Sequence, residues 1–228
     1  MSGWDKSKQI LIKELCFKNK KALDVGCGNG WFSLWADRKG CLVDAIDPSA
    51  IQINDAKQKD SNNKINFIIT GAENIKDLDN IYDLIFFFNS LHHIPENIME
   101  NSIEYCKNRM DINGKILIIE PIAAGNFHNF VKHIDDETNV RYLAYEAIKN
   151  CKKYNLQIVK ELMYNEIKTF NNGEECINFL SKVDESRISY IKANKDFLLS
   201  EFNRLSEYNN KKYEFIQPMR LNIIENKI

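Results

Sequence analysis

The fold is decided by the stretch Leu-Asp-Val-Gly-Cys-Gly-Asn-Gly at residues 23–30, which follows a short apolar run that begins at Lys21. A strand that runs into a Gly-x-Gly-x-Gly turn lets the backbone bend sharply where a side chain would collide with a ligand. The helix expected after the turn offers free N–H groups and the positive end of its dipole. The stretch therefore predicts a strand–turn–helix unit that cradles a ligand, although ordinary tight turns also use glycine.

Outward from this turn, strand-like runs alternate with helix-like runs through the first half of the chain. The alternation predicts an α/β fold with a doubly wound, mostly parallel sheet. Right-handed crossovers bring the carboxyl ends of the strands to one edge, where ligands bind in open sheets. Strands are expected at 21–25, 41–46, 66–70, 83–88 and 115–120, and helices at 31–39, from Pro48 or Ser49 to 59, and from Pro95 onward.

The second half has a different character, because residues 125–136 are polar and aromatic with weak periodicity. We expect helices at 140–151, 174–180 and 185–207, and strands at 156–169 and 213–225. The whole chain then forms one domain with about seven strands, including an antiparallel member in the last pair. Its core covers about 20–121, 140–169 and 213–228, and helical cap insertions cover about 122–139 and 170–209.

Three features narrow the ligand of the glycine turn. Asp47 ends the second strand about twenty residues after the glycines, where a carboxylate can accept hydrogen bonds from ribose hydroxyls. Asp24 stands before the glycines, and Gly30 follows Gly28 by two residues rather than the three of the dinucleotide fingerprint. These last two features favour a nucleoside that carries an amino acid over one that carries a pyrophosphate.

Residues 23–30, Asp47, 71–73, 83–94 and 113–120 together resemble the class I (Rossmann-like) S-adenosylmethionine-dependent methyltransferases of small-molecule type. The resemblance covers about residues 21–121 and implies that S-adenosylmethionine is the cofactor. It also implies that the glycine turn lines the methionine part, that the end of the second strand holds the ribose, and that the segment after the third strand contacts adenine. Asn89 and Ser90 would flank the methyl-transfer position. The implied cofactor residues are Asp24, Gly26, Cys27, Gly28, Asn29, Gly30, Asp47, Pro48, Ala72, Glu73, Asn89 and Ser90.

The sequence departs from the family at one place in this set. Many members have Gly-Asp-Ala after the third strand, with the acid near the adenine amino group, whereas this chain has Gly71 at the acidic position. Either Glu73, two residues further on, or a backbone carbonyl would take over that contact.

Methyl transfer from a sulfonium depends largely on positioning and desolvation, so a general base is needed only when the acceptor must lose a proton. His92 is our candidate base, because it follows the fourth strand at the ligand edge and histidine titrates near neutrality. The alternative is that one of His92 and His93 shapes the loop while the other is solvated. His93 is also a candidate for contact with the acceptor.

Further candidates for binding the acceptor are His128, His133, Arg141 and Arg220. The histidines follow the fifth strand, where they would line a lid, belong to a solvated loop or lie on a partly packed lid helix. Guanidinium groups suit carboxylate and phosphoryl ligands, so converging arginines would indicate an anionic acceptor. The alternative is that the arginines pair with cap carboxylates, for which the candidates are Asp135, Asp136, Glu137 and Asp184. The histidine spacing is weak evidence for a metal, and none is expected.

Composition and charge limit the remaining possibilities. The 228 residues carry a formal net charge of −1, which argues against nucleic acid as a partner. Six cysteines without a Cys-x-x-Cys pair, and no secretory or membrane-spanning run, indicate a reduced, cytoplasmic protein with no membrane partner. The sequence does not indicate the oligomeric state.

The predicted activity is transfer of a methyl group to an oxygen atom of a small acceptor, and carbon and nitrogen acceptors stay open. Oxygen is favoured because the chain has neither the Asn/Asp-Pro-Pro-Tyr motif of amino-directed nucleic-acid enzymes nor a Pro-Cys nucleophile. Three alternatives stay open. They are an NAD(P)-dependent oxidoreductase, a protein that binds S-adenosylmethionine without catalysis, and a nucleic-acid methyltransferase.

Overall fold

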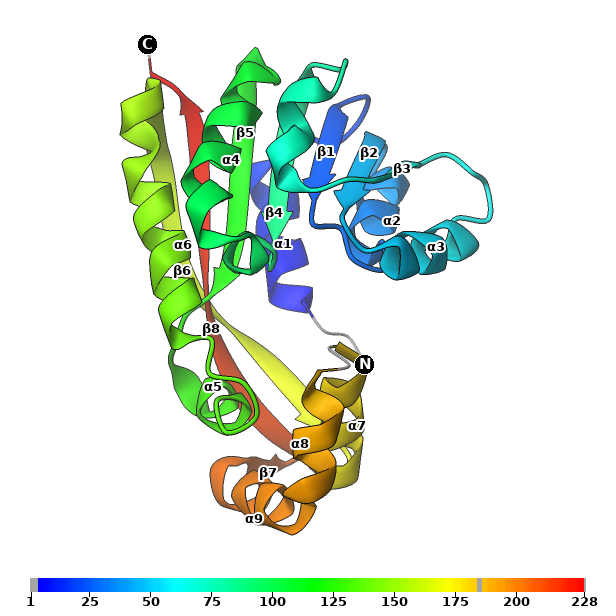
Figure 1. The fold of residues 1–228 in the computed structure, drawn as a ribbon, viewed down its shortest axis with the longest axis vertical. Coiled ribbons are helices and arrows are strands. Elements are labelled where there is room, and N and C mark those ends of the chain that lie inside the picture. The colour runs from blue at the N-terminus through cyan, green and yellow to red at the C-terminus, as the bar shows by residue number, and fades with distance from the viewer. Residues whose placement is uncertain (1–3, 184–185, 228) are drawn as a thin grey trace. The chain divides into compact units, whose positions relative to one another are not determined.

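The computed structural model describes residues 4–183 and 186–227, and its strands form one eight-stranded sheet within these residues (Figure 1). The order across the sheet is β3-β2-β1-β4-β5-β8-β6, and β7 pairs with β8. The pairs among β1 to β5 are parallel. The strands are β1 (Lys21–Val25), β2 (Leu42–Asp47), β3 (Asn66–Ile69), β4 (Tyr82–Phe88), β5 (Met110–Pro121), β6 (Leu156–Phe170), β7 (Glu207–Asn209) and β8 (Lys212–Asn226).

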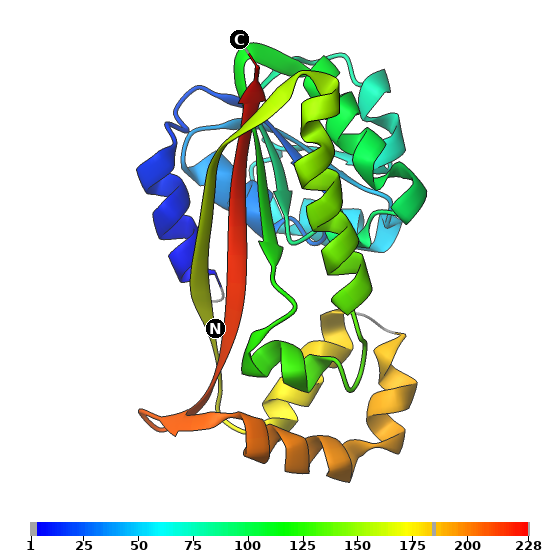
Figure 2. The same cartoon turned by 90° about the vertical axis from the view of Figure 1, so that its left-hand side faces the viewer.

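Helices connect and cover these strands, which confirms the predicted doubly wound α/β class. β8 runs opposite to β5, so the expected antiparallel member is present (Figure 2). The helices are α1 (Asp5–Glu14), α2 (Trp31–Arg38), α3 (Ala50–Lys59), α4 (Glu96–Asn108), α5 (Gly125–Val131), α6 (Thr138–Lys149), α7 (Gly173–Val183), α8 (Arg187–Ala193) and α9 (Lys195–Leu205), with short 3-10 turns η1 (Ala72–Asp77), η2 (Leu91–His93) and η3 (Asn150–Tyr154).

The chain divides into two compact units. We call Leu11–Glu120, Val140–Met163 and Arg220–Ile228 the core unit, and Met1–Ile10, Pro121–Asn139 and Tyr164–Met219 the cap unit. The expectation of one domain with a cap stays a prediction.

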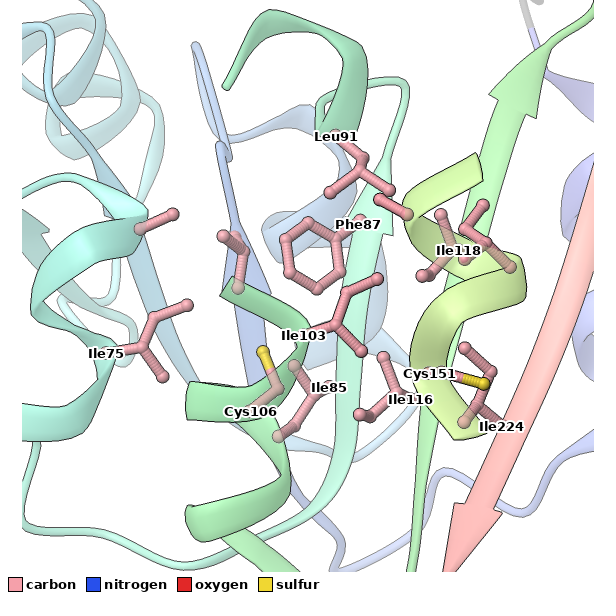
Figure 3. Close-up of a cluster of buried hydrophobic side chains, with 14 of the residues drawn as sticks. Ile75, Ile85, Phe87, Leu91, Ile103, Cys106, Ile116, Ile118, Cys151 and Ile224 are labelled. Carbon is pink, nitrogen blue, oxygen red and sulfur yellow. The ribbon is translucent and has the colours of Figure 1, made fainter. Parts of the chain in front are cut away.

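The core unit is held together by aliphatic packing between the sheet and the helices on one of its faces. Ile85 and Phe87 of β4 are fully buried and belong to one cluster with Ile103 and Cys106 of α4 (Figure 3). Figure 3 also labels Ile116 and Ile118 of β5, Ile224 of β8, Cys151 of η3, Ile75 of η1 and Leu91 of η2. Burial on both faces explains why β4 has a continuous apolar sequence.

The cap unit has an aromatic core of its own. Phe130 of α5 lies 5.5 Å from Phe215 of β8, and Phe202 of α9 lies 5.3 Å from the same ring, measured between centroids. Aromatic pairs at these separations add to the stabilisation from their buried area. The weakly periodic segment after β5 therefore forms a helix, α5, because its phenylalanines pack into this cluster.

The structure differs from the predicted elements at β5, at the helix predicted over 185–207 and at β7, and it adds the helix α1 before the first predicted strand. β5 begins at Met110 rather than at the predicted residue 115, and its pairing with β4 is irregular there, because Tyr82 pairs with Met110 while Leu84 pairs with Lys115. The helix predicted at 185–207 is two helices, α8 and α9, because Asn194 has a non-helical φ of −118°. The strand β7 adds one member to the seven that we predicted.

Candidate functional site

The glycine turn after β1 has a backbone that only glycine adopts without strain. Gly26, Gly28 and Gly30 have φ of 70°, 51° and 75°, all in the left-handed region. The N–H groups of Gly26 and Cys27 both donate to the carbonyl of Ile46, at 2.9 and 3.0 Å. The turn is thereby tied to the end of the neighbouring strand β2.

The surroundings of the three glycines differ. A Cβ at Gly26 would lie 2.6 Å from Ser90 Cβ, and a Cβ at Gly30 would lie 2.8 Å from Ala56 Cβ. These two glycines allow close packing of the turn. Among the described residues, a Cβ at Gly28 would have one neighbour within 4 Å, Gln52 Oε1 at 3.9 Å, so these residues leave the space above Gly28 open to a ligand.

Asp47 at the end of β2 fixes the turn through its carboxylate. Its Oδ2 accepts the Gly28 N–H at 2.9 Å, and its Oδ1 accepts the Ser49 N–H at 2.8 Å. Each carboxylate oxygen has a second lone pair, so the group can still accept hydrogen bonds from a pair of ribose hydroxyls. The open space above Gly28 and this oriented carboxylate fit a nucleoside ligand.

Asp24 is buried, and Ser33 of α2 donates a hydrogen bond of 2.5 Å to its Oδ2. Burial raises the pKa of this carboxyl to about 7. Burial likewise raises the pKa of the neighbouring Cys27 thiol above its usual range, so this thiol is protonated near neutrality. Asp24 thus joins the turn to α2, and its contact with a cofactor stays a prediction.

In the segment after β3 the Glu73 carboxyl lies against Gly71, the residue at which the resemblance would place an acid. A Cβ at Gly71 would collide with the Glu73 carboxyl, whose Cδ would lie 2.7 Å away. Glycine at 71 therefore leaves room for the Glu73 side chain to fold back over it. Ala72 is buried and Glu73 is exposed. Asn29 and Pro48 are also exposed, and the cofactor contacts of all four stay predictions.

The loop after β4 is organised by Glu120, the residue before the last one in β5. Glu120 Oε1 accepts the backbone N–H groups of Ser90 and Leu91, at 3.0 and 2.9 Å. The Ser90 hydroxyl donates to the carbonyl of Val25 at 2.6 Å, which joins this loop to the glycine turn. Asn89 has a left-handed φ of 56° and donates its N–H to Ile119.

His92 lies against the same carboxylate. Its Nδ1 makes a hydrogen bond with Glu120 Oε2, and the exposed fractions of the two residues are 3% and 7%. The ring of His93, which is exposed, lies 4.0 Å from that of His92 between centroids. Sequence reasoning missed Glu120. The available signal was an acidic residue at the carboxyl end of an apolar parallel strand, on the expected ligand edge.

Arg220 of β8 lies across the strand pair from Glu120. Lys115 pairs with Glu225, and Ile122 donates its N–H to the carbonyl of Pro218, so the same register sets Glu120 opposite Arg220. Residues opposite each other in this way project to the same face of the sheet.

The Arg220 guanidinium stacks on an aromatic ring, with its Cζ 3.5 Å from the centroid of Tyr145. Glu161 Oε2 lies 3.9 Å from its Nε, which is close enough for an ion pair but too far for a hydrogen bond. Glu161 also accepts from Asn222 at 2.8 Å. Arg141 precedes Tyr145 by one turn of α6, on the same helical face. Pairing of Arg220 with a cap carboxylate stays a prediction, and Asp184 lies outside the described residues.

The other candidates belong to the cap unit, where each has a neighbour in that unit. His128 is buried with its Nε2 3.3 Å from the Thr138 hydroxyl, and His133 Nε2 lies 3.0 Å from Glu201. Arg187 pairs with Asp135 and Glu137, at 2.7 and 2.8 Å. Cap carboxylates thus bind Arg187, an arginine of the same unit. Contact of either histidine with an acceptor stays a prediction.

Comparisons with known proteins bear on this geometry. A family model described as a methyltransferase domain matches residues 22–114. The malonyl-[acyl-carrier protein] O-methyltransferase of Buchnera aphidicola is 28% identical over 204 residues, which span 86% of this chain and 74% of that protein. The tRNA U34 carboxymethyltransferase of Nautilia profundicola is 26% identical over 166 residues, which span 70% of this chain and 49% of that protein.

Solved structures share the fold. A candidate methyltransferase of Bacillus halodurans aligns over 99% of both chains with a TM-score of 0.62 at 17% identity. The magnesium protoporphyrin IX methyltransferase of Synechocystis PCC 6803, with bound S-adenosylmethionine, aligns over 95% of this chain and 76% of that one with a TM-score of 0.52 at 15% identity.

Proposed function

Residues 22–114 form a methyltransferase domain of the class I family that uses S-adenosylmethionine, and from this premise we propose that the chain methylates an oxygen atom of a small acceptor with an anionic group. The observation that carries the proposal is the cradle at the carboxyl ends of β1 and β2. Open space above Gly28 lies beside a carboxylate, Asp47, that backbone N–H groups hold in place.

The residues that would hold the methyl donor follow from that cradle. Asp47 would accept the ribose hydroxyls, the glycine turn would run along the methionine part, and Glu73 would approach the adenine amino group. S-adenosylmethionine supplies a methyl group on a positively charged sulfur, which leaves as a neutral thioether. The protein then has to orient the acceptor and exclude water.

An anionic acceptor is supported by the charge around Arg220. Stacking on Tyr145 fixes the plane of its guanidinium, and no carboxylate among the described residues lies within hydrogen-bond distance of Nε. A planar anion bound in that plane would complete its hydrogen bonds. The register with Glu120 would set the bound anion beside the loop that carries His92, our candidate base.

A small acceptor is favoured over tRNA, on which the Nautilia protein acts by name, because the net charge of this chain is −1. No helix among residues 4–183 and 186–227 is long and apolar enough to cross a membrane. We propose a cytoplasmic location, which is consistent with six free cysteines, five of them buried.

The proposal is tested with tritium-labelled S-adenosylmethionine and four acceptors. These are 3,4-dihydroxybenzoate, catechol, a malonyl thioester of acyl-carrier protein, and total tRNA. We expect transfer to an acceptor that carries a carboxylate, and we expect Arg220→Met to raise KM for 3,4-dihydroxybenzoate but not for catechol. Transfer to tRNA alone, with affinity that falls steeply with salt, would contradict the proposed acceptor class.

A further inference from the structure

The strand β6 lies at one end of the sheet, beside β8 (Figure 2). Among the described residues the strand order ends at β6, so one of its two backbone edges has no neighbouring strand. The strand has 15 residues and contains neither proline nor glycine. Proteins usually keep an edge strand from pairing by making it short or by placing proline or charge on it, because its N–H and C=O groups can add a further strand. The edge of β6 is therefore long and able to pair.

The two faces of β6 have different surroundings. The even-numbered residues face α1, as in the hydrogen bond of 2.6 Å that Lys160 Nζ donates to Glu14. The odd-numbered residues from 157 to 167 are all exposed. Three of them are large and apolar, with exposed fractions of 45%, 68% and 53% for Val159, Met163 and Ile167 respectively. Removing such side chains from water is favourable, so this face has surface that a partner would cover.

The apolar residues of the exposed face are arranged symmetrically about Met163. Val159 precedes Met163 by four residues, and Ile167 follows it by four. The exposed residues between them are polar, Glu161 on one side and Asn165 on the other. The order of apolar and polar residues is thus the same in both directions along the strand. A second, antiparallel copy of the strand, related by a two-fold axis at Met163, sets apolar opposite apolar and polar opposite polar.

Neighbouring registers lack this match. An axis one residue earlier would set Glu161 opposite the partner's Met163. An axis one residue later would set Lys160 opposite the partner's Lys168, and like charges directly opposite each other are destabilising. The axis at Met163 instead sets Lys160 opposite the partner's Glu166, a residue of opposite charge. The side chains on both faces of β6 therefore favour the same register.

We propose that this chain forms a two-fold dimer in which β6 pairs antiparallel with β6 of a second copy, with the axis at Met163. The register depends on this one continuous strand alone. Such a contact closes on itself, because both copies use the same edge and neither has a further one to offer there. A second copy is favoured over a different partner because the pattern of β6 is complementary to itself, and a net charge of −1 opposes self-association only weakly.

Cysteine substitutions test the register directly, each made together with Cys16→Ser to remove an exposed thiol. Oxidation of Met163→Cys should link two copies, since directly opposite residues have Cα atoms about 4.5–5.5 Å apart, a separation that a disulfide spans. Val159→Cys and Ile167→Cys should each stay unlinked alone, because each lies about eight residues, roughly 27 Å, from its equivalent in the partner. The two variants should link to each other when they are mixed under reducing conditions and then oxidised.

Sedimentation equilibrium measures the dimer in solution without a cross-link. We expect the wild type to dimerise and Met163→Lys to raise the dimer Kd by about tenfold or more, because it replaces an apolar pair at the axis by two like charges. The matched control is Ile112→Lys, which changes an apolar residue of β5 that is 77% exposed and should leave the Kd unchanged. Both side chains are exposed, so both variants should keep the circular dichroism spectrum of the wild type.

The outcomes decide the proposal independently of methyl transfer. A wild type that sediments as a monomer at concentrations up to about 1 mM would overturn it. A wild-type dimer in which Met163→Cys does not link, or in which Val159→Cys links to itself, would overturn it as well, because the copies would then meet elsewhere or in another register. A disulfide in Met163→Cys and in the mixed pair, together with a weaker dimer in Met163→Lys, is the result that we expect.

Discussion

Replacing Gly28 by alanine should separate the ligand cradle from the stability of the fold. The atom that the added Cβ would meet among residues 4–183 and 186–227 is Gln52 Oε1, at 3.9 Å, so these residues leave space for it. What remains is the backbone cost at φ of 51°, which for a residue with a side chain is about 1–2 kcal/mol. In a chain of 228 residues each kcal/mol lowers Tm by about 2–4 °C, so we expect a fall of about 2–8 °C.

The effect on the ligand should be the larger one, because the new methyl group occupies the open space above the turn. We expect the Kd for S-adenosylhomocysteine to rise by about tenfold or more, which corresponds to about 1.4 kcal/mol of binding free energy. Isothermal titration calorimetry measures the Kd, and a thermal melt without ligand measures the stability.

Gly40→Ala is the matched control for this variant. Gly40 also has a positive φ, of 96°, and a Cβ there would lie 3.3 Å from Lys18 Cα. We expect its Tm to fall by a similar or larger amount while its affinity for S-adenosylhomocysteine stays that of the wild type. Wild-type affinity in Gly28→Ala would refute the placement of the ligand above the turn.

Three further predictions concern buried charges. The folded pKa of Asp24, about 7, lies above its usual 3.8, so the stability that this carboxyl contributes is present at acidic pH and is lost as the pH rises through 7. The free energy of unfolding of Asp24→Asn, measured with urea, should lack this loss. Stability curves against pH that run parallel for the variant and the wild type would contradict the assignment. Burial lowers the pKa of Lys168 from 10.5 to about 8, and its Nζ lies 3.4 Å from the centroid of the Trp4 ring. Between pH 8 and 10.5 the unfolded chain binds the proton more tightly than the folded one, so the free energy of unfolding of the wild type should rise with pH while that of Lys168→Met does not. Arg187→Met removes the buried guanidinium that pairs with Glu137 and should lower the free energy of unfolding by about 3–5 kcal/mol. A loss below about 1 kcal/mol would show that the pair is solvated.

The sequence predicted best those elements that local pattern alone determines. The strand at 21–25 has the predicted bounds, and α3 ends at the predicted residue with Ser49 as its N-cap, whose hydroxyl accepts the Gln52 N–H. The apolar run of β4 is buried as expected. In each case the signal lies within a few consecutive residues, because hydrophobic period, glycine and capping chemistry are local properties.

The features that sequence reasoning missed depend on neighbours distant in the chain. Glu120 is the end of a strand in the sequence and becomes a hydrogen-bond acceptor only because β5 pairs with β4. Arg220 stacks on Tyr145 of α6, a contact that no spacing pattern contains. The break between α8 and α9 at Asn194 is a local signal that the apolar periodicity on either side obscured. No element was predicted before residue 21, where the structure has the helix α1.

The central claim is that the cradle formed by the glycine turn and Asp47 binds the nucleoside part of S-adenosylmethionine. Calorimetric titration with S-adenosylhomocysteine tests it most directly, on the wild type, on Asp47→Ala, and on Asp44→Ala as a control from the same strand. We predict micromolar binding by the wild type and by Asp44→Ala, and its loss in Asp47→Ala. A folded wild-type protein that binds no S-adenosylhomocysteine, or an Asp47→Ala variant that binds it as tightly as the wild type, would contradict the claim.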